Sequence, residues 1–275
     1  MNENKYTFAD HAITLEGVQN ARELGGYKIG NQTIRHDILL RSGNLSKATP
    51  NDIKWLKEKA NLSLIIDLRS ERETIIEPDA KIDDTKYISL PTIDEASGKA
   101  NDLNIPNEAY GDWGKFLIEF VQSDKAERLE RALYPAFIQS PYSQEQFGKF
   151  MRAIVDTNDG AVLWHCAQGK DRTGLGAAFI LGALGADNEL IINDFAISNE
   201  YYADEIEHFA QKIKEIYNDD RKCQIIRSFV GVNVDYFGEA LKMINKSYGS
   251  MNDYLIKQLK LTEKDLNTLK ERYLE

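Results

Sequence analysis

The sequence predicts an α/β fold with a central, mostly parallel sheet flanked by helices and a helical C-terminal part. Short apolar runs typical of buried strands alternate with amphipathic helical segments as far as residue 184, and the pattern is helical after that. Strands that alternate with helices favour a parallel sheet, because a parallel connection needs a long crossover. The chain shows no internal repeat or low-complexity linker. We therefore expect residues 1–275 to form a single domain.

The composition is that of an ordinary globular protein. The 275 residues are 42% hydrophobic and 28% charged, a balance that excludes an intrinsically disordered chain. The two cysteines are too few for a disulfide scaffold. The net charge of −10 argues against a nucleic-acid partner, because a non-specific nucleic-acid binder needs a basic face to displace counterions.

The N-terminal part reads as short strands, one helix and a buried strand. Glycine-containing turn signals at residues 25–26 and 30–31 divide residues 15–40 into short strands. Thr49 precedes a proline and an acidic residue, which is typical of a helix start, and that helix is expected to end near residue 61. The continuous apolar run 62–68 then predicts a strand buried on both faces.

The middle of the chain continues the alternation. A short strand is expected at residues 87–90, followed by a long polar loop over residues 94–112. Residues 113–131 look like one amphipathic helix. A capping box at residues 143–146 predicts a helix that runs to about Val155.

The strand and helix that carry the most informative segment come next. Residues 161–164 predict a strand, and residues 173–184 predict an apolar helix. Further on, two capping boxes indicate late helix starts. These boxes pair Ser250 with Asp253 and Thr262 with Asp265.

Residues 165–174 carry the pattern that indicates chemistry. They read His-Cys-Ala-Gln-Gly-Lys-Asp-Arg-Thr-Gly and connect a predicted strand to a predicted helix. That position gathers backbone N–H groups around one point at a helix N-terminus, which is a binding site for an anion. Gly169 lets the backbone curl closely, and Arg172 offers a planar fork that holds two oxygens of a phosphate.

A cysteine stands at the mouth of this electropositive segment. The pKa of Cys166 is therefore expected to fall below the free value of about 8.5. A thiolate that faces a bound phosphoryl group is a nucleophile in position for attack. Positive charge is concentrated here, since the only bases between residues 151 and 200 are Arg152, Lys170 and Arg172. Cys223 has no such context and is expected to be an inert thiol.

The segment resembles the signature H-C-x-x-G-K-D-R-[TS]-G of bacterial tyrosine/lipid (triple-specificity-like) phosphatases, which belong to the cysteine-dependent protein tyrosine phosphatases. Every fixed position of that signature is present. The blocks NARELGG at 20–26, LRSG at 40–43 and DLRSERE at 67–73 are also similar to the family's N-terminal blocks. Residues 249–274 look like its C-terminal helices. One departure is Gln168, where relatives often have a small residue.

The resemblance implies a single tyrosine-phosphatase-like domain that hydrolyses phosphomonoesters through a phosphocysteine intermediate, without a metal or another cofactor. It implies Cys166 as the nucleophile and Arg172 as the residue that stabilises the transferred group, while His165 orients the loop. The expected substrate-binding residues are Ala167, Gln168, Gly169, Lys170, Asp171, Arg172 and Thr173. The expected partners are a phosphorylated protein or a phosphoinositide as substrate, and inorganic phosphate as product.

The general acid has two candidates. Many tyrosine phosphatases use an Asp in a Trp-Pro-Asp loop, and this chain contains no such tripeptide. Asp171 lies inside the phosphate-binding segment, and the resembled family implicates that position, so we favour it as the acid. Asp94 opens the long polar loop, about where a movable carboxylic acid can enter a site.

Basic residues raise a second open choice, between protein and lipid substrates. Lys170 corresponds to a lysine that meets additional phosphates in phosphoinositide phosphatases, and the alternative is a general electrostatic contribution to binding one phosphate. Arg22, Arg41 and Arg69 are candidate supports of the loop, and the alternative is that each only pairs with a nearby acid such as Glu23, Asp67 or Glu73. We expect Arg69 at a strand end to be the best placed.

The remaining alternatives concern function class, metals and location. Phosphotyrosine in proteins is the expected substrate, and the rivals are a phosphoinositide phosphatase, a phosphate-reading module without activity and a rhodanese-type sulfurtransferase. The four histidines and two cysteines show no metal-ligand spacing. The longest uncharged apolar stretch, residues 174–186, is too short to span a membrane. Residues 1–10 lack a signal-peptide core, and an essential thiolate favours the cytoplasm, while a secreted mature form stays open.

Overall fold

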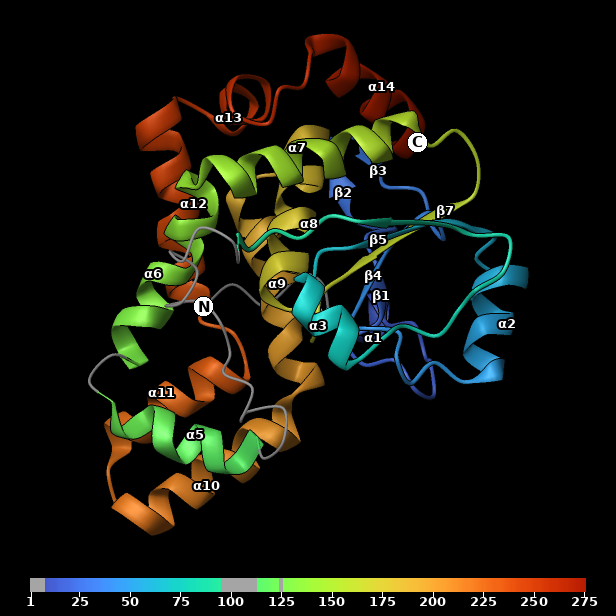
Figure 1. Cartoon of the computed structure of the whole chain (residues 1–275). Coiled ribbons are helices and arrows are strands. Elements are labelled where there is room, and N and C mark those ends of the chain that lie inside the picture. Colours follow the sequence, from blue (N-terminus) through green and yellow to red (C-terminus); the bar gives the residue numbers. More distant parts are fainter. Residues whose placement is uncertain (1–7, 95–112, 124–125) are drawn as a thin grey trace.

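The molecule is built around a five-stranded sheet with helices on both faces (Figure 1). A computed structural model describes residues 8–94, 113–123 and 126–275. The strand order is β1-β4-β7-β5-β6, and β1 is the one antiparallel member. The mostly parallel α/β sheet predicted from the sequence is thus confirmed.

The carboxyl ends of the parallel strands meet at one edge of the sheet. In register, His165 at the end of β7 lies opposite Ser42 of β4 on one side and Asp67 of β5 on the other. Asp67 in turn pairs with Ser89 of β6. The strands are β1 (Arg22–Glu23), β4 (Leu39–Ser42), β5 (Leu62–Asp67), β6 (Lys86–Ser89) and β7 (Ala161–His165), and a separate hairpin joins β2 (Lys28–Ile29) to β3 (Gln32–Thr33).

Alternation along the strands separates two apolar cores. In β7, Val162 and Trp164 face the larger core, whereas Ala161 and Leu163 face the smaller one. The larger core is covered by helices that follow residue 125, and the smaller one by α2 (Pro50–Glu58) and the N-terminal segment. The helices of the larger core are α6 (Ala126–Gln139), α7 (Pro141–Asp156), α8 (Asp171–Leu184), α9 (Asn188–Tyr201), α12 (Val234–Tyr248), α13 (Met251–Lys257) and α14 (Glu263–Tyr273).

A third apolar cluster lies away from the sheet, at the lower left of Figure 1. It joins α5 (Trp113–Gln122), α10 (Ala203–Tyr217) and α11 (Asp220–Val230). Two short helices remain in the described part of the chain, α1 (Phe8–His11) and α3 (Glu71–Ile76).

The helix predicted over residues 113–131 is wrong as a single element. The first helix, α5, ends at Gln122, and α6 begins at Ala126 and continues to Gln139. The two helices serve different cores, because α5 packs on α11 while α6 supplies Tyr134 and Phe137 to the larger core. Hydrophobic periodicity indicates that a helix has an apolar face, but it does not indicate which core that face packs against. The break between α5 and α6 therefore could not be predicted from the pattern.

Helix starts were predictable where the cap is local. Thr49 and Asp52 form a full capping box at α2, and Thr262 and Asp265 form another at α14. At α7 the predicted start at residue 143 is wrong, because the helix begins at Pro141 with Ser140 as its N-cap. The Ser143 hydroxyl instead donates to the carbonyl oxygen of Thr92 at 2.8 Å.

The predicted bounds of two strands differ slightly from those in the structure. The strands predicted at 62–68 and 87–90 correspond to β5 and β6, each within one residue. Of the long polar loop predicted at 94–112, Asp94 is described and residues 95–112 lie outside the described part of the chain. Within the described part, no helix is both long enough and apolar enough to cross a membrane.

Candidate active site

The segment that connects β7 to α8 forms a tight loop at the carboxyl edge of the sheet. We call residues 166–171 the anion loop. Gly169 is in the left-handed region with φ of 67°. A Cβ atom at Gly169 would lie 2.4 Å from the carbonyl carbon of Ser42, so only glycine allows the loop to rest on the end of β4.

The carbonyl groups of the anion loop point outward to donors on the surrounding elements. The carbonyl oxygen of Ala167 accepts from the backbone N–H and the side-chain amide of Asn44, both at 3.0 Å. The carbonyl oxygen of Gln168 accepts from the Tyr202 hydroxyl at 2.8 Å and from the Asn20 amide at 3.1 Å. Because a peptide N–H points opposite to its C=O, this arrangement favours N–H groups that face the inside of the loop.

The carbonyl group of Gly169 is held by residues from the N-terminal part of the sequence. The Gly169 carbonyl oxygen accepts from Asn20 Nδ2 at 2.9 Å and from Arg41 Nη2 at 3.0 Å. Arg41 also pairs with Asp194 of α9, which forms a second ion pair with Arg22 at 3.4 Å. Asn20 itself adopts a φ of 56°, which is uncommon for a residue with a side chain.

This support is a buried charge cluster. Burial, and then the neighbouring charge of Arg22, lowers the pKa of Arg41 to about 10, so Arg41 stays a cation at neutral pH. Burial alone would raise the pKa of Asp194, but Arg41 and Arg22 outweigh it and the pKa is lowered. The two arginines and the aspartate therefore remain charged and tie β1, β4 and α9 to the loop.

Cys166 lies at the base of the loop with its thiol buried. Burial would raise the pKa of the thiol, but the positive charge of Arg172 and hydrogen bonds from Thr173 outweigh it, so the pKa is lowered. Among the described residues, the buried Thr173 hydroxyl has no conventional hydrogen-bond partner, which leaves it for the Cys166 sulfur. The surroundings of Cys166 therefore favour the thiolate more than water does.

Arg172 is fixed by a carboxylate from another element. Its Nη1 lies 2.6 Å from Oε2 of Glu73 in α3, and its Nη2 lies 2.7 Å from Oε1 of the same residue. Glu73 is anchored in turn, because it caps α3 together with Ser70. A guanidinium has five donors, so this end-on pair leaves the Nε–Nη2 edge of Arg172 available for oxygens of an anion.

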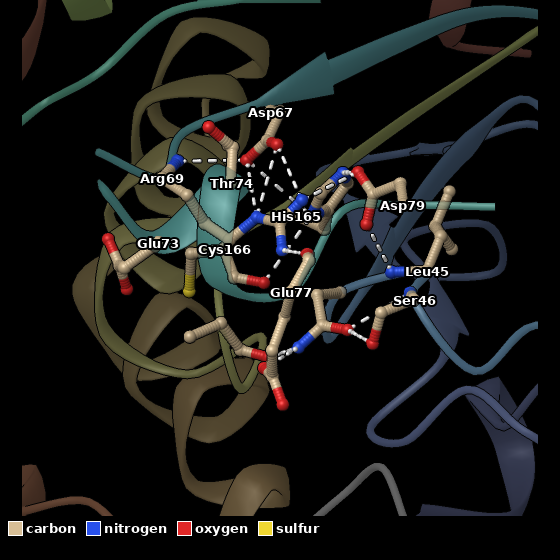
Figure 2. Close-up of polar contacts among 12 residues, drawn as sticks. Leu45, Ser46, Asp67, Arg69, Glu73, Thr74, Glu77, Asp79, His165 and Cys166 are labelled. Atoms are coloured by element: carbon tan, nitrogen blue, oxygen red, sulfur yellow. Dashed lines mark hydrogen bonds and ion pairs between the residues drawn. The ribbon is translucent and has the colours of Figure 1, made fainter. Parts of the chain in front are cut away.

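A buried polar cluster surrounds His165, the residue before the nucleophile candidate (Figure 2). The His165 Nδ1 lies 3.3 Å from the Cys166 carbonyl oxygen, and its Nε2 lies 3.1 Å from Oδ2 of Asp79. Burial lowers the pKa of His165, but the charges of Asp67 and Asp79 outweigh it and the pKa is raised. His165 thus connects the loop backbone to two carboxylates.

His165, Asp67 and Asp79 also form a group of side chains with metal-ligand atoms close together. Arg69 already lies between the two carboxylates, with its Nη2 at 2.8 Å from Asp67 Oδ2 and 2.8 Å from Asp79 Oδ2. The positive charge that balances this group is therefore a guanidinium. Arg69, which we expected to be the best placed loop support, pairs with these acids, and Arg41 is the arginine that contacts the loop.

Lys170 is directed away from the interior of the anion loop. Its buried ammonium group donates to the carbonyl oxygens of Phe229 at 3.1 Å and Val230 at 2.5 Å, at the end of α11. It also lies 5.6 Å from the centre of the Tyr202 ring. In this conformation Lys170 joins the loop to the helical cluster around α11.

The two candidate acids differ in their surroundings. Asp171 is half-buried at the first position of α8 and accepts a hydrogen bond of 2.7 Å from the Tyr134 hydroxyl. Asp94 lies at the last described position before residue 113, beyond the end of β6. The contact to Tyr134 shows that α6 reaches the anion loop, which the sequence did not indicate.

The structure thus brings Cys166, Asp171, Arg172 and Thr173 together around one loop. Sequence reasoning named Arg41 as a candidate support of the loop but missed the other partners that hold it, because each is distant along the chain. Two of them lie in the blocks that resemble the phosphatase family, Asn20 in residues 20–26 and Glu73 in residues 67–73, so those blocks were the available signal. Asp194 and Tyr134 had no such signal.

Comparison with known proteins agrees with the geometry. A family model described as the tyrosine phosphatase family matches residues 13–275. A putative tyrosine-protein phosphatase of Cupriavidus necator is 25% identical over 267 residues, covering 96% of this chain and 89% of that protein. The triple specificity protein phosphatase PtpB of Mycobacterium tuberculosis is 26% identical over 263 residues, covering 88% and 91%.

A third relative, a tyrosine-protein phosphatase of Nostoc commune, is 27% identical over 241 residues, covering 86% of this chain and 74% of that protein. The match to the family model extends over nearly the whole sequence and includes the anion loop. An anion-binding loop with a buried, activated cysteine is the chemistry that such a family requires. The chain therefore belongs to the tyrosine phosphatase family and is a phosphatase.

Proposed function

We propose that the chain hydrolyses phosphomonoesters through a phosphocysteine intermediate on Cys166, with phosphotyrosine in proteins as its main substrate. The observation that carries this proposal is the lowered pKa of the Cys166 thiol beside an arginine that Glu73 holds in place. Phosphoserine, phosphothreonine and phosphoinositides are further candidate substrates. The proposed chemistry uses side chains and water, without a metal or another cofactor.

In the first proposed step, Cys166 Sγ attacks the phosphorus in line with the ester bond. The P–S bond forms, the P–O bond to the leaving group breaks, and Asp171 gives its proton to the leaving oxygen. The backbone N–H groups of residues 167–172 and the free edge of Arg172 bind the three phosphoryl oxygens and stabilise the charge that they carry.

In the second step, water replaces the thiolate. The Asp171 carboxylate accepts a proton from the attacking water, the new P–O bond forms, and the P–S bond breaks to release inorganic phosphate. The Thr173 hydroxyl donates a hydrogen bond to the departing sulfur and stabilises the thiolate, which keeps Cys166 a good leaving group. The contact of Asp171 with Tyr134 supports Asp171 over Asp94 as the acid, because it holds the carboxyl beside the loop in a defined orientation.

A phosphoinositide phosphatase is the second candidate function. In that case Lys170 would bind an additional ring phosphate, whereas its ammonium group contacts the last carbonyls of α11. This contact supports a protein substrate. We further propose that residues 1–275 act as one domain and work in the cytoplasm, where the thiolate stays reduced.

The test is the Cys166→Ser variant assayed with p-nitrophenyl phosphate. We expect turnover to fall by at least about 1,000-fold while inorganic phosphate still binds, because serine lacks an activated thiolate but leaves the anion loop intact. Cys223→Ser is the matched control, since Cys223 is also buried but contacts the Ala210 carbonyl. Retained turnover in Cys166→Ser, or activity that needs added metal, would contradict the proposal.

A substrate panel separates the remaining candidates. Phosphotyrosine, phosphoserine and phosphothreonine peptides are compared with mono- and polyphosphorylated inositol lipids at equal enzyme concentration. Preference for phosphotyrosine peptides supports the proposal. Preference for polyphosphorylated lipids favours the lipid function, phosphate binding without turnover indicates a phosphate-reading module, and thiosulfate turnover indicates a sulfurtransferase.

A further inference from the structure

A tyrosine from α6 contacts the carboxyl group of Asp171. The Tyr134 hydroxyl donates to Oδ1 of Asp171 at 2.7 Å. The ring is fully buried, with a relative exposure of 2%. Among the described residues, Tyr134 is the side chain that hydrogen-bonds this carboxyl. The contact joins α6 to α8, and the two residues lie 37 positions apart in the sequence.

The position of this hydroxyl is defined by a rigid aromatic group. The Tyr134 ring meets Phe195 of α9 edge-on, with ring centres 5.6 Å apart at 87°, and Phe237 of α12 at 5.3 Å and 82°. Phe195 and Phe237 are themselves stacked at 3.8 Å. Such edge-to-face pairs are favourable and directional, so the ring has little freedom to swing away from Asp171.

The hydroxyl keeps its proton under all ordinary conditions. Burial, and then the negative charge of Asp171, raises the pKa of Tyr134 well above its usual value. Tyr134 therefore acts as a neutral donor, and the oxygen that it contacts is an acceptor. When Asp171 is protonated, its proton must sit on the other oxygen, Oδ2.

We propose that Tyr134 is a positioning residue for the phosphatase reaction, which fixes the Asp171 carboxyl so that the proton on Oδ2 is presented to the leaving oxygen of the ester. This inference rests on the proposed role of Asp171 as general acid. Tyr134 itself exchanges no proton with the substrate. In the step, the Oδ2–H bond breaks as the leaving oxygen gains the proton, and the Tyr134 hydroxyl stabilises the carboxylate that remains.

The leaving group provides the test. Phenyl phosphate releases a basic phenoxide that needs protonation, whereas 2,4-dinitrophenyl phosphate releases a weakly basic one that does not. We expect Tyr134→Phe to lower kcat about 10-fold for phenyl phosphate and less than about 2-fold for 2,4-dinitrophenyl phosphate, with KM unchanged. Both esters are assayed on the same preparation, so the ratio of the two rates is independent of the fraction of folded enzyme.

Asp171→Asn provides the reference for this ratio. We expect it to lower kcat about 100-fold for phenyl phosphate and only a few-fold for 2,4-dinitrophenyl phosphate. Adding Tyr134→Phe to Asp171→Asn should then change kcat for phenyl phosphate by less than about 2-fold, because the two residues act as one unit. A merely structural tyrosine would instead cause the same loss in both backgrounds.

Tyr254→Phe is the matched control. Its buried hydroxyl also donates to α6, but to the Ile138 carbonyl oxygen at 2.9 Å and not to the Asp171 carboxyl group. We expect it to leave the ratio of the two rates unchanged. Equal slowing of both esters by Tyr134→Phe would overturn the role of Tyr134. Equal slowing by Asp171→Asn would instead overturn the proposed general acid, so the two failures are distinguishable.

Discussion

Gly169 is the residue at which the anion loop rests on the end of β4. Its φ of 67° and the short approach to Ser42 leave no room for a side chain. The close approach lets the Gly169 carbonyl reach both Asn20 and Arg41. At this position, backbone conformation, packing and the orientation of the loop amides therefore depend on the same missing Cβ atom.

Gly169→Ala should consequently abolish most of the activity. The added Cβ would lie 2.4 Å from Ser42 backbone, so the loop must move, and a displacement of about 1 Å in a site can cost 100-fold in rate. We expect kcat/KM for p-nitrophenyl phosphate to fall at least about 100-fold, together with weaker binding of inorganic phosphate. Activity assays and calorimetric titration with phosphate provide the measurements.

Gly30→Ala is the matched control for that variant. Gly30 also has a positive φ, 61°, but a Cβ there would meet no atom within 4 Å. We expect it to lose about 1 kcal/mol of stability and to keep full activity. If Gly169→Ala behaved in the same way, the close packing of the loop on β4 would be irrelevant to catalysis.

The residues of the site divide by distance along the chain. Cys166, Gly169 and Arg172 lie within one turn of backbone, so their spacing alone predicted an anion loop beside a nucleophile. Glu73 and Asp194 reach the same place through tertiary packing, and a carboxylate looks the same in the sequence whether it meets solvent or an arginine. The sequence therefore predicted the residues of the anion loop, but it did not predict the buried ion pairs that hold the loop and Arg172 in place.

Helix α6 carries an unusual carboxyl group, Glu130, one turn before Tyr134. Burial raises its pKa to about 8, because its hydrogen bond from Ser228 does not offset the loss of water and the charge of Asp171 adds to the effect. Among the described residues, its Oε1 has no hydrogen-bond partner. The folded protein thus keeps a proton on Glu130 at neutral pH, whereas the unfolded chain releases it near the ordinary glutamate pKa of 4.5.

This difference predicts a pH-dependent effect of Glu130→Gln. The unfolded state binds fewer protons between about pH 4.5 and pH 8, so the free energy of unfolding of the natural chain falls as pH rises through that window. Glutamine does not ionise and removes that loss. We expect Glu130→Gln to be more stable than the natural chain by roughly 2–4 kcal/mol at pH 8, and to lose this advantage near pH 4.5.

Urea unfolding at a series of pH values measures the effect. Glu127→Gln on the same helix is the control, because Glu127 is paired with Arg221 and its pKa is lowered rather than raised. That variant should show no gain in stability at high pH. A gain of Glu130→Gln that is the same at pH 5 and pH 8 would contradict a buried, protonated carboxyl group.

At the scale of elements, the sequence predicted the helix starts that are determined by interactions between residues close together in the chain. The cap at Thr49 and the cap at Thr262 use residues three positions apart, so both helix starts were correct. The start of α7 was placed two residues late because Ser143 belongs to a second good capping pattern, while Ser140 and Pro141 form the actual cap. The turn between α5 and α6 depends on which core each helix joins, and that choice is made by the rest of the molecule.

At the scale of the whole molecule, Asp67 at the end of β5 connects this strand to the end of β7, where it lies opposite His165. Burial alone would raise the pKa of Asp67, but His165, Arg69 and the Tyr87 hydroxyl outweigh it and lower the pKa to about 2. The unfolded value is 3.8, so this group contributes stability that is fully present above pH 3.8 and lost as pH falls through about 2.

Acid unfolding should therefore depend on Asp67. We expect the natural chain to lose about 2 kcal/mol more stability than Asp67→Asn between pH 4 and pH 2, although the variant is less stable at neutral pH. The measurement is denaturant unfolding at each pH. Asp83→Asn, at an exposed position, should follow the natural chain. Parallel pH curves for the natural chain and Asp67→Asn would refute the contribution of this buried aspartate.

The fold class was predictable because alternation of strands and helices leaves few arrangements other than a mostly parallel sheet. The order of the strands was not, since β7 enters the sheet between β4 and β5 although it follows them by about a hundred residues. The position of β7 depends on how its two buried faces pack against the two cores. Val162 and Trp164, for example, pack in the larger core. Periodicity reports that a strand is buried and does not report its neighbours.

The contact between Asp194 and the two arginines of β1 and β4 has a consequence for the chain as it is synthesised. When the ribosome has synthesised residues 165–174, every residue of the signature is present, but Arg22 and Arg41 still lack the carboxylate of Asp194 that pairs with them. Residues as far as Tyr202 must emerge before the loop carbonyls find all their donors. The anion loop of a nascent chain therefore lacks part of its support until α9 has formed, and we expect phosphatase activity to appear only after that point.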